Sequence, residues 1–489
     1  MRILHKSFYL KFLLVLFCYS ICFQNDILAQ DKAAKMDEVM KKIAENRQFN
    51  GSVLVAEKGE IVYKNGFGYA NIDWKIPNNP DTKFRIGSIT KQFVALQIMQ
   101  LVEEGKIKLD GKLTDYLPEY RKDTGDKVTI HHLLTHTSGI PSYTGLPGFW
   151  SDSTRNPYEI DYMVKHFHSG DLEFEPGSEY RYNNTGYFLL AVIIEKVTGK
   201  SYEKNLQDRI LIPLDMKNSG VDRNAEILEN KASGYYKELT GYTNEPYFYM
   251  LNAMGAGDMY STVEDLYLWD RALYTDKLIS EKSKKIMFTP FLNKYAYGWG
   301  VSNVSLGESS DSVQVVTHSG GINGFNTRIF RLIEDGHLIV LFNNTGSTNL
   351  SEMCNTITNI LYDRPFKIPK ISIAETIGKT ILASDIEAAV KQYHELKTGQ
   401  PDAYNFEESE LNNLGYQLLG ENKIQEAIEI FKLNIEQYPD AFNPYDSLGE
   451  GYMIAGEKEL AIKNYAKSLE LNPKNTNAII MLARINKSN

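Results

Sequence analysis

The chain has 489 residues, of which 43% are hydrophobic and 12% aromatic, and this length allows about two to four packed domains. Its net charge is −9, from 53 basic and 62 acidic residues. A nucleic-acid-binding surface needs a concentrated basic patch, and the sequence contains no such block, so we expect no nucleic-acid partner.

Residues 1–29 have the pattern of a secretory signal peptide. Arg2, Lys6 and Lys11 form a basic start, residues 13–23 form an uncharged apolar run, and Ala29 stands near a plausible cleavage point. The alternative is a transmembrane anchor, which the shortness of the apolar run disfavours. No later run is long and apolar enough to cross a membrane, so we expect no transmembrane span in the mature chain.

Cysteine usage agrees with export. Only Cys354 lies outside the predicted signal peptide, so the mature chain can form neither an internal disulfide nor a cysteine-rich metal site. Export without disulfides suits a bacterial periplasm or the cell exterior, and we expect the protein in one of these places.

Residues 31–365 are predicted to form one domain with strands at both ends and helices between them. The predicted helices are 33–45, 88–103, 130–134 and 187–198, and the predicted strands are 52–56, 60–64, 297–301, 313–318, 325–332 and 337–342. Strands from both ends of a domain can share one antiparallel sheet. This order therefore predicts an α+β domain with an inserted helical region.

Two further segments follow this domain. Residues 366–405 are predicted to be a helical linker, with a helix over 386–396. Residues 406–489 contain a repeat, because Leu414-Gly415 recurs 34 residues later as Leu448-Gly449, and Pro439 recurs as Pro473. This period and pattern predict a tetratricopeptide repeat module with a capping helix over 475–485.

The tetrad Ser88-Ile89-Thr90-Lys91 is the first candidate for chemistry. Residues three apart on a helix lie on the same face, so the Lys91 amine would stand beside the Ser88 hydroxyl. Burial lowers the pKa of a lysine, and a neutral amine can take the proton of a serine. Ser-x-x-Lys alone is a weak motif, so its meaning depends on the other segments.

A second segment, 180–187, is predicted to be a loop that enters a helix, and it holds Tyr182 and Asn184. A phenol between two cations can be held as phenolate and act as a base, and Lys91 is one possible cation. The amide of Asn184 can orient Lys91 and a substrate carbonyl. The alternative is an ordinary tyrosine-rich loop, since the chain has 31 tyrosines.

A third segment, 315–324, is predicted to be a strand that runs into glycines. An edge strand presents backbone N–H groups, and glycine lets a substrate approach closely. The N–H of Gly321 can pair with that of Ser88 to form an oxyanion hole. The alternative is a glycine-rich turn after a buried strand, with His318 as filler.

Ser-x-x-Lys at 88–91, Tyr-x-Asn at 182–184 and His-x-Gly at 318–320 together resemble the serine β-lactamase and penicillin-binding-protein superfamily, especially its class C β-lactamase, D,D-peptidase and esterase branch. The flanking segments match as well, at 132–141, 187–199 and 254–262. The resemblance covers about residues 33–365. It implies an antiparallel sheet flanked by helices, and no metal or organic cofactor.

The resemblance also implies a role for each matched residue. Ser88 attacks a carbonyl and forms an acyl-enzyme, while Lys91 and Tyr182 move the proton to the leaving group and later activate water. The N–H groups of Ser88 and Gly321 supply the oxyanion hole. The implied substrate-binding residues are Asn184, His318, Ser319 and Gly320.

One departure from the family pattern bears on the substrate. β-Lactamases usually begin the third motif with lysine, a fixed cation for the antibiotic's carboxylate, whereas His318 is only partly charged near neutral pH. Histidine occurs at this place in some D,D-peptidases and D-aminopeptidases of the family. This departure disfavours β-lactamase activity, while a D-amino-acid peptide, a β-lactam and a short ester stay open as substrates.

The remaining histidines raise the alternative of a metal site. His132 and His136 are four residues apart, next to His131, but no His-Glu-x-x-His pattern and no obvious third ligand accompany them. We therefore expect no metal. His166 and His168 alternate in a polar segment, so we expect both to face solvent.

The sequence thus predicts an exported serine hydrolase that acts through an acyl-enzyme on an amide, peptide or ester carbonyl, of D,D-carboxypeptidase, D-aminopeptidase or esterase type. The alternative is a non-catalytic sensor or scaffold that binds cell-wall peptide or a β-lactam and a partner protein through its repeats. The repeats either bind a partner protein or pack on the hydrolase domain, and the sequence leaves both open.

Overall fold

The computed structural model describes residues 31–239, 241–346 and 348–487, so the predicted signal peptide lies outside the described residues. The chain divides into two compact units. The first holds the residues up to 236 together with 243–368, and the second holds 237–242 together with the residues from 369 onward. None of the described helices is long and apolar enough to cross a membrane.

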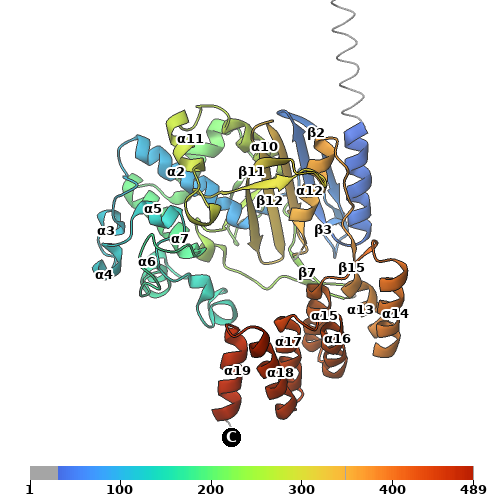
Figure 1. Ribbon diagram of the computed structural model, residues 1–489. Helices are drawn as coiled ribbons and strands as arrows, with labels where there is room; N and C mark the ends of the chain where they lie inside the picture. Colours follow the sequence, from blue (N-terminus) through green and yellow to red (C-terminus); the bar gives the residue numbers. More distant parts are fainter. Residues whose placement is uncertain (1–30, 240, 347, 488–489) are drawn as a thin grey trace, which may run out of the picture. The chain divides into compact units, whose positions relative to one another are not determined.

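The first unit is built on a six-stranded antiparallel sheet with the strand order β10-β11-β12-β13-β1-β2 (Figure 1). Its strands are β1 (Gly51–Glu57), β2 (Glu60–Phe67), β10 (Gly300–Ser305), β11 (Ser312–Ile322), β12 (Phe325–Leu332) and β13 (His337–Asn343). β1 comes from the start of the unit and pairs with β13 from its end, with Val53 opposite Leu341. The predicted α+β fold is therefore confirmed.

Different helices cover the two faces of this sheet. Residues 31–45 form a helix that packs with α12 (Leu350–Leu361) on one face, against alternate strand residues such as Val53 and Phe330. The neighbouring strand residues, such as Leu54 and Ile329, face the inserted helical region on the other side. Burial on both faces explains why the central strands β1 and β13 are mostly apolar at successive positions.

The inserted region between β2 and β10 is mostly helical, as predicted. Its main helices are α2 (Thr90–Glu103), α3 (Leu113–Tyr116), α4 (Lys122–Gly125), α5 (Ile130–Leu134), α6 (Ile160–Phe167), α7 (Asn184–Thr198), α8 (Tyr202–Leu206), α9 (Ile212–Leu214), α10 (Val263–Ala272) and α11 (Glu281–Phe288). Short strands accompany them, namely β3 (Tyr69–Asn71), β4 (Ile76–Pro77), β5 (Phe84–Arg85), β6 (Gly220–Val221), β7 (Tyr235–Lys237), β8 (Tyr242–Asn244) and β9 (Met259–Ser261).

Helix α2 is buried on most of its surface, including its polar residues. The Phe93 ring stacks on Trp269 of α10 with the centroids 4.3 Å apart, and the Trp269 indole donates to Gln92 Oε1 at 3.0 Å. α7 and α11 also pack against α2. A helix enclosed in this way has little freedom to shift, so it is a rigid support for side chains at its N-terminal end.

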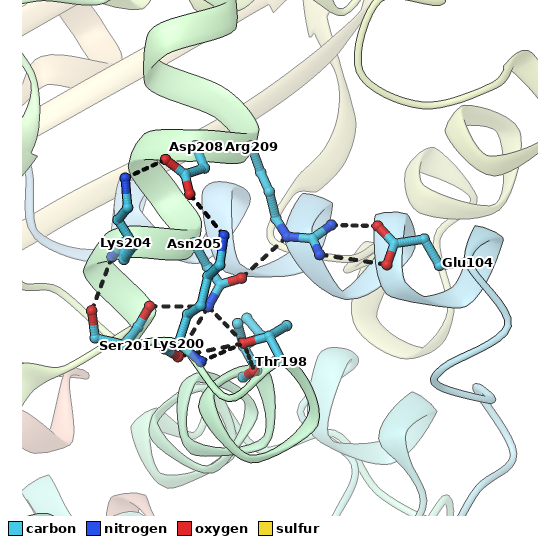
Figure 2. Close-up of polar contacts among 9 residues, drawn as sticks. Glu104, Thr198, Lys200, Ser201, Lys204, Asn205, Asp208 and Arg209 are labelled. Carbon is cyan, nitrogen blue, oxygen red and sulfur yellow. Dashed lines mark hydrogen bonds and ion pairs between the residues drawn. The ribbon is translucent and has the colours of Figure 1, made fainter.

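A polar network joins the C-terminal ends of α2 and α7 (Figure 2). Asn205 of α8 is buried, and its Nδ2 donates to Thr198 Oγ1 at 2.8 Å. Its Oδ1 accepts from Arg209 Nε at 3.2 Å, and Arg209 Nη1 donates to Glu104 Oε1 at 2.5 Å. The two helices are thus tied together at the ends opposite to Ser88, Lys91 and Asn184.

The second unit is mainly helical. It contains β14 (Ile371–Ser372), α13 (Ile373–Ala383), α14 (Ile386–Gly399), β15 (Tyr404–Asn405), α15 (Glu408–Gly420), α16 (Ile424–Gln437), α17 (Phe442–Ile454), α18 (Lys458–Leu471) and α19 (Thr476–Lys487). Gly415 packs against the Phe431 ring, and 34 residues later Gly449 packs against the Tyr465 ring. A helical C-terminal region is confirmed, while its assignment to tetratricopeptide repeats stays a prediction.

Residues 369–405, which are most of the predicted linker, are part of this second unit. Ile377 of α13 and Tyr393 of α14 are buried in the same apolar cluster as Leu414 of α15. The cluster also includes Leu239, from the segment 237–242 in the middle of the chain. Sequence patterns gave no indication of this placement, because a single leucine in a turn carries no periodicity.

Candidate active site

Ser88 lies in a single 3₁₀ turn, Gly87–Ile89, that leads directly into α2. β9 holds the turn on one side, because the Ile86 N–H donates to the Met259 carbonyl at 2.9 Å and the Met259 N–H donates to Thr90 Oγ1 at 3.2 Å. Ser88 itself is half-buried. The serine is therefore fixed by backbone contacts and still keeps an accessible side.

Strand β11 holds the same turn on the other side, and glycines allow the close approach. A Cβ on Gly320 would stand 1.9 Å from the Ile86 carbonyl oxygen, and a Cβ on Gly87 would stand 2.7 Å from the Gly321 nitrogen. The Thr327 hydroxyl donates to the same Ile86 carbonyl at 2.9 Å. The backbone of the serine turn thus packs directly on the backbone of β11.

Lys91 is fully buried, and three oxygen atoms surround its amine. Lys91 Nζ lies 2.9 Å from Ser88 Oγ, 2.8 Å from Asn184 Oδ1 and 2.7 Å from the Ala256 carbonyl oxygen. The nitrogen also lies 5.0 Å from the centroid of the Tyr182 ring. Two of the three segments singled out in the sequence, 88–91 and 180–187, therefore meet at this amine, together with the loop that contains Ala256.

Burial lowers the pKa of Lys91 well below its usual value, and the Asp258 carboxylate acts in the opposite direction. A neutral amine has two N–H donors and one lone pair. The Ala256 carbonyl and Asn184 Oδ1 can accept the two N–H groups, which leaves the lone pair for the Ser88 hydroxyl. The hydrogen-bonding partners of Lys91 therefore suit an uncharged amine.

Asp258 is a buried carboxyl that sequence reasoning missed. The Gly255 N–H donates to Asp258 Oδ1 at 3.1 Å, whereas Oδ2 has no hydrogen-bond partner among the described residues. Burial raises the pKa of Asp258 to about 7. The only sequence indication was the position of Asp258 in the glycine-rich segment 254–262, which places it beside the Lys91 contact at Ala256.

Asn184 begins α7, directly after the capping residue Asn183, whose Oδ1 accepts from the Gly186 N–H at 2.9 Å. The side-chain Nδ2 of Asn184 lies 3.0 Å from Thr144 Oγ1, and the backbone N–H of Asn184 donates to Ser142 Oγ at 3.2 Å. Because both ends of the Asn184 amide have partners, its oxygen is held toward Lys91. This orientation is what the sequence analysis proposed for Asn184.

Tyr182 lies beside Ser88 and Lys91 and keeps 37% of its surface exposed. Burial around the phenol raises its pKa, although a hydrogen bond with Ser88 acts the other way. The phenolate expected from the sequence is therefore not what the structure favours. The physical reason is the burial of the phenol, and the cation expected beside it, Lys91, has a lowered pKa as well.

His318 is buried on β11 and differs from the partly charged residue that we expected. Its Nδ1 lies 2.6 Å from the Ser319 carbonyl oxygen, which can only accept, and its Nε2 lies 3.0 Å from the Tyr295 hydroxyl. Burial lowers the pKa of His318 to about 3. The imidazole is thus neutral at neutral pH, with its proton on Nδ1, so the site has no fixed cation at this position.

The other residues predicted on β11 lie on different sides of the strand. Gly320 faces Ile86, whereas Ser319 lies on the opposite face of the sheet, directly across from Arg328. A Cβ added to Gly321 would have no heavy atom of the described residues within 4 Å. β10 pairs with β11 only as far as Thr317, so the following residues have β12 as their neighbour in the sheet.

The histidines that suggested a metal site make other contacts in the structure. His131 contacts the Tyr297 hydroxyl at 2.7 Å, and His132 Nδ1 accepts from the Thr129 N–H at 3.2 Å. Among the described residues no group of three or more His, Cys, Asp or Glu could hold a metal ion. His168 is buried against Phe188, so the expectation that it faces solvent is wrong, because aromatic packing outweighs the polar sequence around it.

An antiparallel sheet with a serine–lysine pair at the head of a buried helix defines a β-lactamase-like α+β protein. The family model described as "Beta-lactamase" matches residues 36–357. The chain therefore belongs to the β-lactamase and penicillin-binding-protein superfamily, as its motifs indicated.

Individual relatives agree with this assignment. "Penicillin-binding protein 4*" of Bacillus subtilis (strain 168) is 33% identical over 366 residues, which are 70% of this chain and 79% of the relative. The octameric penicillin-binding protein homologue from Pyrococcus abyssi matches with a TM-score of 0.60 and 29% identity, over 71% of this chain and 81% of that chain. D-amino acid amidase from Ochrobactrum anthropi SV3 matches with a TM-score of 0.57 and 26% identity, over 67% of this chain and 99% of that chain.

The contact between the serine turn and β11 predicts a difference between two adjacent glycines. Gly320→Ala should lower the free energy of unfolding by about 1–3 kcal/mol, because the new methyl group would overlap the Ile86 carbonyl. Gly321→Ala is the matched control and should change the stability by less than about 0.5 kcal/mol. Urea unfolding of both variants measures this, and equal losses would contradict the described packing.

The buried Asp258 carboxyl predicts a pH dependence of stability. Its pKa is raised to about 7 in the folded chain, so the folded state holds this proton more tightly than the unfolded state. The contribution of this carboxyl to the free energy of unfolding should therefore fall, by at most about 1.4 kcal/mol per pH unit, as the pH rises from about 4 to 7. Buried histidines with lowered pKa values, such as His168 and His318, act in the opposite direction in wild type and variant alike. Asp258→Asn should lack this fall in urea titrations at several pH values, and a parallel dependence in both proteins would contradict the assignment.

Proposed function

We propose that this protein is an exported serine hydrolase that acts by acyl transfer on an amide or ester carbonyl. The observation that carries the proposal is the buried Lys91 amine, whose nitrogen lies 2.9 Å from Ser88 Oγ while two other oxygens can accept its N–H groups. Family membership supports the reaction class. The features of residues 1–29 support export.

In the first step Ser88 Oγ forms a bond to the substrate carbonyl carbon while its proton passes to the neutral Lys91 amine. The carbonyl oxygen becomes an oxyanion, for which the N–H groups of Ser88 and Gly321 are the proposed donors. The direct packing of the Gly87 turn on Gly321 supports this pairing, because it brings the two backbones together.

In the second step the bond to the leaving group breaks and the leaving group takes a proton. Tyr182 suits this role as a neutral phenol, because its raised pKa keeps the proton available until the leaving group needs it. Tyr182 then recovers a proton from the Lys91 ammonium, and both groups return to their starting protonation states. The Lys91 nitrogen lies 5.0 Å from the Tyr182 ring centroid, so the two groups are neighbours. Water then hydrolyses the acyl-enzyme by the reverse sequence of proton transfers.

The substrate class follows from the neutral His318. A β-lactam or a peptide with a terminal carboxylate gains most from a fixed cation beside the third motif, and the structure favours an uncharged imidazole there. We therefore propose amides and esters without a carboxylate at this position as the preferred substrates. The similarity of the fold to a D-amino acid amidase supports this choice.

The proposal is tested by labelling the protein with a fluorophosphonate and measuring its intact mass. Wild type should gain one adduct, Ser88→Ala should gain none, and Lys91→Ala should react about 10²- to 10⁴-fold more slowly because it lacks the base. Lys106→Ala is the control, because this lysine is exposed and pairs with Glu104 at the far end of α2. An equal adduct on wild type and Ser88→Ala would refute the assignment of Ser88.

Turnover separates an enzyme from the sensor alternative. Wild type should hydrolyse p-nitrophenyl esters and D-amino-acid amides repeatedly, and it should hydrolyse them faster than nitrocefin because His318 is neutral. A protein that is acylated once at Ser88 and then stops would favour the sensor.

A further inference from the structure

His136 adjoins the site but has no part in the proton transfers proposed above. It follows α5 by two residues and is buried, with 1% of its surface exposed. Its backbone φ angle is +59°, in the left-handed region that residues with a Cβ seldom adopt. A strained backbone at a buried polar residue is a reason to ask what its side chain does there.

The backbone and the ring of His136 together hold both neighbours of Tyr182. The His136 carbonyl accepts from the Arg181 N–H at 2.9 Å, and its Nδ1 accepts from the Asn183 N–H at 3.1 Å. Tyr182 therefore lies in a short segment whose two flanking N–H groups bind one residue.

The imidazole ring also packs on the phenol itself. The ring centroids of His136 and Tyr182 are 4.3 Å apart, with an angle of 45° between the planes. Tyr295 and Tyr187 lie around the same imidazole, at 4.5 and 5.2 Å. Tyr182 is exposed on another side, so His136 supplies much of the packing that fixes the direction of its hydroxyl.

The contact with Asn183 requires a neutral imidazole. Because Nδ1 accepts a hydrogen bond, the proton must be on Nε2, and an imidazolium would place two donors face to face. Burial lowers the pKa of His136 well below its usual value, and the neighbouring Lys91 and His318 act in the same direction. The remaining groups around the ring are the tyrosines at 180, 182, 187 and 295.

The Nε2 of His136 has no hydrogen-bond partner among the described residues. An unpaired buried donor is unfavourable, as is the left-handed backbone. A purely structural residue at this place would avoid both costs. A histidine at this place is explained if its ring is needed to position Tyr182.

We propose that His136 is a positioning residue, which as a neutral imidazole holds the Tyr182 hydroxyl in place beside Ser88. This inference rests on the proposed function of Ser88 and Tyr182, and it adds a requirement that the three sequence motifs do not contain. His136 acts through Tyr182 and does not itself exchange a proton with the substrate.

A double-mutant cycle on the full-length chain tests the proposal. His136→Asn retains a residue that tolerates a left-handed backbone. It should slow hydrolysis of a D-amino-acid amide about 10- to 100-fold, because the amine leaving group needs the proton of Tyr182 and small displacements of a catalytic group cost this much. In the Tyr182→Phe background the same substitution should slow the reaction less than about 2-fold, because the hydroxyl that His136 positions is gone. Independent, additive effects would overturn the proposal.

His132 provides the matched control. Its Nδ1 also accepts a backbone N–H, from Thr129 at 3.2 Å, so His132→Asn removes the same kind of contact from the same segment. His132 is only half-buried, so we expect His132→Asn to lower stability less than His136→Asn and to leave the rate of amide hydrolysis within about 2-fold of wild type. Equal slowing by both variants would show that His136 is merely structural.

A measurement on unreacted wild type covers the cases in which a variant does not fold or Ser88 does not react. In ¹⁵N-histidine NMR spectra, the His136 resonances should show an unprotonated Nδ1 and a protonated Nε2 from pH 5 to 8. A histidine that titrates in this range, or a proton on Nδ1, would overturn the inference. Failure of wild type to form any Ser88 adduct, with this tautomer present, would instead refute the proposed function.

Discussion

The buried amine of Lys91 is the interaction on which the rest of the site depends. Its three oxygen partners come from the serine turn, from the start of α7 and from the loop that contains Ala256. Loss of any one of them would leave a buried polar group unpaired, which is costly in an apolar interior. The amine thus joins segments that are far apart in the sequence, and burial keeps it uncharged enough to serve as a base.

Backbone contacts place the serine relative to this amine and to the sheet. Gly87 and Gly320 let the serine turn and β11 approach more closely than side chains would allow, and the Thr327 hydroxyl stabilises the contact. At the opposite end, the network around Asn205 ties α2 to α7. Because both ends of the two helices are fixed, Ser88, Lys91 and Asn184 keep their relative positions without help from a substrate.

Much of this arrangement was predictable from local patterns. The alternating and apolar runs predicted five of the six sheet strands closely. Ser-x-x-Lys and Tyr-x-Asn marked segments that meet at Lys91, and His-x-Gly marked a strand that packs on the serine turn. The protonation states were not predictable, because they depend on burial by residues distant in sequence. Tyr182 and His318 therefore differ from expectation. The places of Asp258 and Tyr295, and the contact of His136 with Tyr182, emerged only from the fold.

The central claim of this account is that the Lys91 amine is uncharged when it meets Ser88. ¹³C NMR of protein labelled at lysine Cε, with Lys91→Ala used to assign the resonance, measures this directly through the pH dependence of each lysine signal. The account predicts that Lys91 titrates well below the exposed lysines, because burial opposes its charge. A Lys91 signal that titrates together with the exposed lysines would contradict it.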